Sequence, residues 1–268
     1  MDIVKVGEDK KSGRVCFIIK GINPGLANAL RRTMMDAVPT MAIDEVEVRK
    51  NDSILYDEML AHRLGLIPLK TDLKSYTLPA KCKCGGVGCA RCTLKMTLKD
   101  SSAGEVSAFS IKSKDPAVKP VYDIPIVSLL KDQELELEMT AKLGQGKEHT
   151  KWSSCLAYYR YLPSISIDAA KCTNADAVAK ICPVAVFDVK GGKLTINKEN
   201  ELNCHLCGAC VDLATNESVK LNETDHDYLF FIEPWGQLSV REIFNTAFDM
   251  LTEEAEEFEA ALKAAKKE

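Results

Sequence analysis

Cys204-His205-Leu206-Cys207-Gly208-Ala209-Cys210, with Cys182-Pro183 upstream of it, is the stretch that decides how residues 164–221 fold. Three of these cysteines repeat as C-x2-C-x2-C, and the fourth is followed directly by proline. Cysteine thiolates at these spacings are the ligands of cubane iron–sulfur clusters. The stretch therefore predicts a domain that folds around a cluster.

The segment around these cysteines resembles a bacterial-type ferredoxin, in which two C-x2-C-x2-C-x3-C-P runs each give their fourth cysteine to the other run's cluster. Here Ala214 stands where the second run's fourth cysteine belongs. The first run keeps Cys172 and Cys182 but has Ala175 and Val178 between them. The resemblance implies one complete site for one cluster, 4Fe–4S or, after oxidative loss of an iron, 3Fe–4S. Its ligands are Cys182, Cys204, Cys207 and Cys210. The alternative is a ferredoxin-like fold that holds no iron.

Between the two cysteine runs, residues 188–196 read DVKGGKLTI, two short alternating strands around Gly191-Gly192. A Gly-Gly pair between such strands is typical of a tight β-hairpin. The order of runs and hairpin predicts a ferredoxin-like domain over residues 164–221.

A second cysteine group has the spacing Cys82-x-Cys84-x4-Cys89-x2-Cys92, with three glycines inside it. Four thiolates in a short loop suit a tetrahedral structural zinc ion, and glycines let such a loop turn tightly. The C-x-C spacing is tighter than the usual zinc spacing. A redox-active Cys89/Cys92 pair, a second iron site and a loop without metal are therefore the alternatives, although no thioredoxin-like context surrounds the pair.

Composition describes an ordinary globular protein of 268 residues, 46% hydrophobic and 28% charged, with room for two or three domains. No apolar run reaches the roughly 18 residues of a membrane span, and Met1 to Lys5 is no signal peptide, so we expect a cytoplasmic protein. There the eleven cysteines would stay reduced, which favours metal sites over disulfides. The net charge of −4 argues against broad electrostatic binding of nucleic acid.

Hydrophobic patterns predict the remaining elements. Asn23-Pro24 is a helix start, with Asn23 as the cap, and the helix is expected to end at Ala37, before Pro39. Alternation predicts a hairpin over 2–20 and a β-rich middle region. The other expected elements are a short helix over 56–64, strands over 43–48, 94–98, 106–111, 135–139 and 228–232, and a polar loop over 144–154.

The chain ends in a long predicted helix. Ser239 and Glu242 form the S-x-x-E capping box that starts it. Its apolar stripe is Val240, Phe244, Ala247, Leu251, Phe258 and Leu262. A stripe of this length needs a partner surface, and a second chain is one source of it.

Three motifs resemble those of the alpha-like subunits of RNA polymerases. The first is Asn28-Ala29-Leu30-Arg31-Arg32 with VPTMAIDEV at 38–46; the second is LAHRLGLIPL at 60–69; the third is the loop 144–154. The ferredoxin-like insertion is similar to that of the archaeal branch of the family, whose members are called subunit three. The cysteine loop is similar to the zinc loop of the eukaryotic third-largest subunit. The chain is thereby identified as a member of this family.

The resemblance implies an α+β protein with three parts: a discontinuous dimerisation domain (1–48 and 222–268), a β-rich insert domain (49–163) with the cysteine loop 82–92, and the ferredoxin-like domain (164–221). It implies a non-catalytic assembly platform of archaeal DNA-directed RNA polymerase, because the catalytic aspartates and magnesium belong to other subunits. The implied partners are the small alpha-like subunit L, the second-largest catalytic subunit and the small subunits N and P. The implied interface residues are Asn28, Leu30, Arg31, Arg32, His62, Arg63, Phe244, Leu251, Phe258 and Leu262.

Two other function classes compete with this interpretation. A ferredoxin-type electron-transfer protein or redox-enzyme subunit would explain the insertion, yet the sequence has no dinucleotide fingerprint. A zinc-dependent nucleic-acid binder would need the basic aromatic patch that this sequence lacks. No Walker loop or nucleophile elbow appears either, so we expect no catalytic residue on the chain.

Overall fold

The computed structural model describes residues 1–265, apart from the side chains of residues 223 and 225. The predicted segment 222–268 thus extends three residues beyond them. The chain forms two compact units: one contains residues 1–8, 15–28 and 158–231, and the other contains residues 9–14, 29–157 and those from 232 onward. No helix in the described residues is long and apolar enough to cross a membrane.

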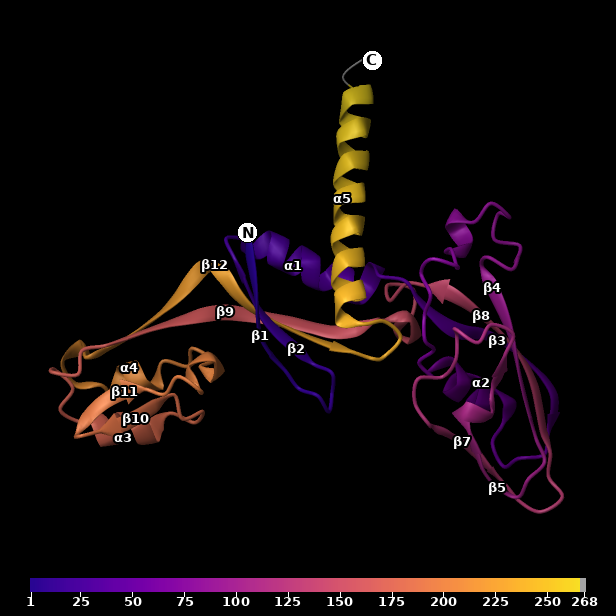
Figure 1. The fold of residues 1–268 in the computed structure, drawn as a ribbon, viewed down its shortest axis with the longest axis horizontal. Coiled ribbons are helices and arrows are strands. Elements are labelled where there is room, and N and C mark those ends of the chain that lie inside the picture. The colour runs from indigo at the N-terminus through magenta and orange to yellow at the C-terminus, as the bar shows by residue number, and fades with distance from the viewer. Residues whose placement is uncertain (266–268) are drawn as a thin grey trace. The chain divides into compact units, whose positions relative to one another are not determined.

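The first unit is built on a four-stranded sheet with the order β1-β2-β12-β9 (Figure 1). Its strands are β1 (Asp2–Glu8), β2 (Val15–Lys20), β9 (Cys155–Ile167) and β12 (Val219–Pro234). Aromatic side chains on neighbouring strands stack: the ring centroids of Phe17 and Phe230 lie 5.8 Å apart, and those of Tyr159 and Phe230 lie 5.1 Å apart. Such pairs hold strands together beyond their hydrogen bonds. The predicted hairpin over 2–20 is confirmed as β1 and β2.

The part of this unit that the sequence predicts to be ferredoxin-like contains α3 (Ala175–Ile181), β10 (Phe187–Lys190), β11 (Lys193–Ile196) and α4 (Ala209–Leu213). The predicted hairpin is confirmed: Lys190 pairs with Lys193, and Gly191 and Gly192 both have positive φ, as a type I′ turn requires. Single turns of 3₁₀ helix, η5 (Glu201–Asn203) and η6 (Thr215–Glu217), flank α4. Val178, Phe187 and Leu194 form the small core together with three buried cysteines.

The second unit is centred on a sheet with the order β3-β8-β4-β6. These strands are β3 (Thr40–Asn51), β8 (Leu135–Gly144), β4 (Thr93–Asp100) and β6 (Lys112–Ser113); β5 (Gly104–Ser107) pairs with β7 (Pro125–Leu129). Helix α2 (Asp57–Gly65) packs on β3 and β7 and buries Leu60 and Leu64 in the same core as the alternate apolar residues of β4 and β8. Short 3₁₀ turns are η2 (Pro79–Lys81), η3 (Ala108–Ser110) and η4 (Thr150–Trp152).

Two sequence predictions in this unit need correction. The strand expected over 106–111 ends at Ser107, because the Ser107 hydroxyl accepts a hydrogen bond from the Phe109 N–H and caps the 3₁₀ turn η3. The helix expected from Pro24 to Ala37 is α-helical only in α1 (Pro24–Arg32); residues Thr33–Ala37 form a π turn, η1. The predicted start is confirmed, since Asn23 Oδ1 accepts a hydrogen bond of 2.7 Å from the Leu26 N–H.

The C-terminal helix α5 (Val240–Ala265) is one uninterrupted helix in Figure 1. Its capping box is confirmed: Ser239 N–H donates to Glu242 Oε2 at 2.9 Å, and Glu242 N–H donates back to the Ser239 hydroxyl at 3.3 Å. These bonds also lower the pKa of Glu242, the serine hydroxyl contributing most. Ile243 and Ala247 are buried, so the first half of the helix belongs to the core.

Candidate metal centres and partner surfaces

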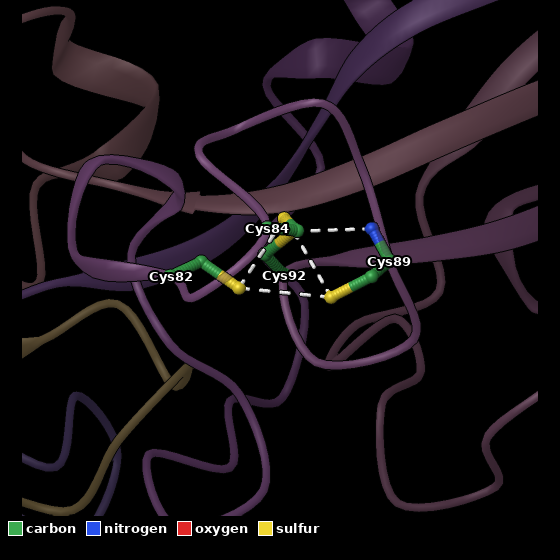
Figure 2. A group of neighbouring side chains, drawn as sticks. All are labelled: Cys82, Cys84, Cys89 and Cys92. Carbon is green, nitrogen blue, oxygen red and sulfur yellow. Dashed lines mark hydrogen bonds between the residues drawn. The ribbon is translucent and has the colours of Figure 1, made fainter.

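The cysteine loop over 82–92 brings four sulfur atoms together between η2 and β4 (Figure 2). The Sγ–Sγ distances are 3.4 Å for Cys82–Cys84, 3.6 Å for Cys82–Cys89, 3.5 Å for Cys84–Cys92 and 3.7 Å for Cys89–Cys92. Zinc bound to four sulfurs at about 2.3 Å requires Sγ–Sγ edges of about 3.8 Å in a regular tetrahedron. The four thiols therefore fit one metal ion, whereas a cubane would need its ligands further apart.

The backbone of this loop prepares the thiols for a cation. Gly85, Gly86 and Gly88 all have left-handed φ, between 66° and 106°, which lets the loop reverse between its two cysteine pairs. A backbone hydrogen bond from Gly88, followed by bonds from the neighbouring thiols, lowers the pKa of Cys84 to about 6. Burial raises the pKa of Cys92 to about 12. Hydrogen bonds therefore favour the thiolate of Cys84, whereas burial disfavours the thiolate of Cys92.

Cys182, Cys204, Cys207 and Cys210 line a single small cavity. Val184, Val186, Phe187 and Leu221 supply most of its apolar wall. The Val186 N–H donates to the Cys182 sulfur at 3.4 Å. Burial raises the pKa of Cys210, and negative charge on Cys204, Cys182 and Cys207 raises it further, which reflects how near the four sulfurs lie.

The backbone that carries these cysteines is held in uncommon conformations. Leu206, between two of the cysteines, has φ 57°, and Ala185, three residues after Cys182, has φ 51°. Left-handed φ costs a non-glycine residue about 1 kcal/mol or more, and such residues concentrate where a loop wraps a ligand. An apolar wall, four thiols and an N–H aimed at sulfur are the donor set and surroundings that a cubane cluster requires.

The region predicted to correspond to a second, incomplete cluster site is filled by packing. Val178 and Ala175, at the positions of two missing ligands, are buried in the domain core. Asn174 bridges the two ends of this region: its Nδ2 donates to the Leu213 carbonyl at 2.8 Å, and its Oδ1 accepts from the Thr215 N–H at 3.3 Å. Hydrogen bonds and a valine side chain thus fill the region where a second cluster would lie.

The third family motif, the loop 144–154, is the one whose role the sequence explained least. Gly144 and Gly146 allow close approach: an added Cβ would lie 2.3 Å from the Trp152 ring and 2.2 Å from the Met35 carbonyl oxygen, respectively. Gln145 Nε2 donates to the Ala37 carbonyl at 2.7 Å. The loop therefore fixes the π turn η1 that follows α1.

A half-buried charge cluster anchors the same loop. Asp44 lies at a β-bulge in β3, and its carboxylate accepts hydrogen bonds from Lys142 Nζ at 2.5 Å and Lys151 Nζ at 2.6 Å. Burial alone would raise the pKa of Asp44, but the two lysines outweigh it and hold the pKa below its ordinary value. Lys151 Nζ also lies 4.3 Å from the Trp152 ring centroid. No sequence signal pointed to this cluster, because a bulge re-aims a side chain without a local motif.

The predicted interface residues differ in exposure. Asn28, Arg32 and His62 are exposed, Arg31 is half-buried beside Met35, and Leu30 lies in the core. Arg63 donates to the carbonyls of Ile126 (2.9 Å) and Pro125 (2.7 Å), so it ties α2 to β7.

On α5 the stripe becomes more exposed toward the C-terminus. Phe244 and Leu251 are half-buried, whereas the side chains of Phe258 and Leu262 are 67% and 46% exposed. The exposed end of the stripe therefore lies in the C-terminal half of α5.

Comparisons with known proteins agree with this arrangement. The model of the RNA polymerase Rpb3/RpoA insert domain matches residues 45–170. Proteins named DNA-directed RNA polymerase subunit Rpo3 are similar over almost the whole chain. The one from Methanosphaera stadtmanae is 37% identical, covering 92% of this chain and 94% of its own. Those from Archaeoglobus fulgidus (35%; 93% and 94%) and Pyrobaculum calidifontis (36%; 91% of each) are similar to the same extent.

Proposed function

The chain belongs to the family of archaeal DNA-directed RNA polymerase subunits named Rpo3, and we propose that it acts as the non-catalytic assembly platform of that enzyme. The observation that carries the proposal is that the similarity covers more than nine tenths of both chains. A ferredoxin-type electron carrier would account for residues 164–221 alone.

The small alpha-like subunit L is the proposed partner of α5. The exposed Phe258 and Leu262 continue the stripe that Ile243 and Ala247 begin in the core. Burial of each large side chain would contribute about 1.5–3 kcal/mol, which suits a stable heterodimer. The glutamates around them, such as Glu254 and Glu257, would remain at the rim.

The second-largest catalytic subunit, with the small subunits N and P, is proposed to bind the surface of α1 and α2. Arg32 is exposed there and makes one ion pair, with Asp36 at 3.7 Å, while His62 is exposed on α2. Tyr56 and Met59, which are near His62 in the sequence, also have exposed apolar side chains. A polar and apolar mixture of this kind is typical of a protein interface.

Two metal centres complete the proposal. Cys182, Cys204, Cys207 and Cys210 would hold one iron–sulfur cluster, which would link the two cysteine segments covalently next to the small core of this domain. The cysteine loop over 82–92 would hold one zinc ion, whose binding free energy keeps the loop closed. Both centres would act by ordering surfaces of the chain.

Co-expression with the small alpha-like subunit tests the platform. The pair is expected to co-purify at one to one, and Leu262→Asp should abolish co-purification while the helical content stays unchanged. Glu254→Gln, an exposed neighbour on the same helix, is the matched control and should leave the pair intact. A pair that forms equally well with Leu262→Asp would contradict the proposed use of α5.

A further inference from the structure

Arg160 links the sheet of the first unit to the segment that leads into Cys204. It lies on β9, and its guanidinium donates through Nη2 to the Leu202 carbonyl and through Nη1 to the Asn203 carbonyl, the latter at 3.4 Å. These carbonyls belong to the turn η5 and directly precede Cys204. The position of Cys204 is therefore set by a side chain more than forty residues away in the sequence.

The charge of Arg160 has no carboxylate partner among the described residues. The guanidinium carbon lies 5.4 Å from the Phe231 ring centroid. The Arg160 Nε is buried, and no described residue accepts a hydrogen bond from it. Carbonyl dipoles and a ring satisfy a cation only in part, and a partly buried charge without a counter-ion is costly. Such a cation is favourable where an anionic group lies near it.

The cysteine cavity is where such an anion would be. Four thiolates outweigh the positive charge of a cubane core, so the loaded site is anionic, and charge and hydrogen bonds around a cluster set its reduction potential. The two residues that Arg160 holds, Leu202 and Asn203, lead into Cys204, which lines that cavity. A cation held at this place would both fix the ligand loop and favour the more negative, reduced state.

We propose that Arg160 is a positioning residue for the cluster: it holds the backbone before Cys204 in place and supplies positive charge to the loaded site. This inference rests on the proposed iron–sulfur cluster. Arg160 would have two separable roles. Its hydrogen bonds to the backbone need the forked geometry of the guanidinium, whereas its electrostatic effect on the cluster needs only a positive charge.

The test uses the full chain, loaded with its cluster under anaerobic conditions. Arg160→Met keeps the apolar part of the side chain and removes both the hydrogen-bond donors and the charge. Arg160→Lys keeps the charge but has a single donor group, the ammonium. Arg241→Met, at an exposed arginine of α5, is the control for the same chemical change. Two quantities are measured: the rate at which a ferrous chelator removes iron, and the midpoint potential of the cluster by redox-poised EPR.

For Arg160→Met we expect iron release about tenfold faster, the effect of losing one strong pair of hydrogen bonds, and a more negative potential. Arg160→Lys should release iron at an intermediate rate with a potential close to that of the wild type, and Arg241→Met should change neither. If Arg160→Met released iron faster but kept the wild-type midpoint potential, Arg160 would act only by holding the backbone, and the proposal would be overturned. An unchanged release rate would overturn it as well.

If Arg160→Met does not fold, Arg160→Lys provides the test. An iron-release rate in Arg160→Lys equal to that of the wild type would also overturn the proposal. A wild-type chain that takes up no iron is a different result. It would refute the iron–sulfur cluster itself, on which the role of Arg160 depends.

Discussion

Replacement of Asp44 by asparagine tests the charge cluster that anchors the loop 144–154. Asparagine keeps the shape of the side chain but leaves Lys142 and Lys151 without their shared carboxylate. The side chains of Asp44 and Lys151 are 20% and 13% exposed, so water can replace the lost partner only in part. Lys142 is more exposed, at 34%, and loses less.

The magnitude follows from the two hydrogen bonds that Asp44 accepts. A hydrogen bond to a charged group contributes about 1.5–3 kcal/mol, and the more exposed Lys142 bond is counted at about 0.5 kcal/mol. We therefore expect Asp44→Asn to lower the free energy of unfolding by about 2–3.5 kcal/mol at pH 7. Glu47→Gln, which breaks the exposed pair with Arg49 on the same strand, should cost less than about 0.5 kcal/mol.

The effect must also depend on pH with a defined sign. The pKa of Asp44 is lowered in the folded chain, so its contribution is fully present above the ordinary value of 3.8 and disappears as the pH falls through the lower, folded value. The difference between wild type and Asp44→Asn should thus be constant from pH 7 to about pH 5 and shrink below pH 3.8.

Trp152 is a local reporter for this measurement, because it lies in the loop next to Lys151. In a Trp235→Phe background, urea unfolding followed by tryptophan fluorescence reports the second unit alone. The reasoning would be refuted if Asp44→Asn and Glu47→Gln were equally stable at pH 7, or if the difference between wild type and Asp44→Asn did not shrink as the pH falls below 3.8.

The metal sites and the glycine contacts give three further predictions. Cys204→Ser should lose the iron and its visible absorption, whereas Cys172→Ser, at the closed second site, should keep the iron content of the wild type; equal iron in both variants would contradict the ligand assignment. Cys89→Ser should release the zinc, measured by metal analysis after gel filtration, while Cys16→Ser should retain one zinc per chain, and zinc retention by Cys89→Ser would point to another site. Gly146→Ala should lower the free energy of unfolding by about 3 kcal/mol, because its Cβ would lie 2.2 Å from the Met35 carbonyl oxygen; Gly191→Ala, with open space around its Cβ, should cost only the strain of left-handed φ, about 1 kcal/mol.

Features with a local cause could be predicted from the sequence. The hairpin around Gly191-Gly192 and the capping box at Ser239 each depend on residues within a few positions, and both are present in the structure. The convergence of Cys82, Cys84, Cys89 and Cys92 was predictable for the same reason, since a short loop holds all four.

Features with a distant cause could not be predicted. The change from α-helix to π turn after Arg32 accompanies contacts with the loop 144–154, more than a hundred residues later. The Asp44 cluster needs a bulge between two strands that are far apart in the chain. Arg160 gives no signal in the sequence because its partners are two backbone carbonyls, which any residue provides.

The identity of the metals is a proposal that rests on geometry. The Sγ–Sγ distances in the loop 82–92 favour a single ion. The four cysteines that line one apolar pocket, Cys182, Cys204, Cys207 and Cys210, favour a cluster. The two proposed centres contain different metals, iron and zinc, so one metal analysis on the intact chain distinguishes them.

The central claim is tested most directly by anaerobic purification of the tagged chain from its own cells, with identification of the bound proteins and analysis of iron and zinc. The account predicts a small alpha-like partner together with the large polymerase subunits, about four irons (or three, after oxidative loss of one) for one cubane cluster and about one zinc per chain. Recovery of the chain alone, or together with flavin- or hydrogenase-type redox enzymes, would contradict the platform and favour an electron-transfer role.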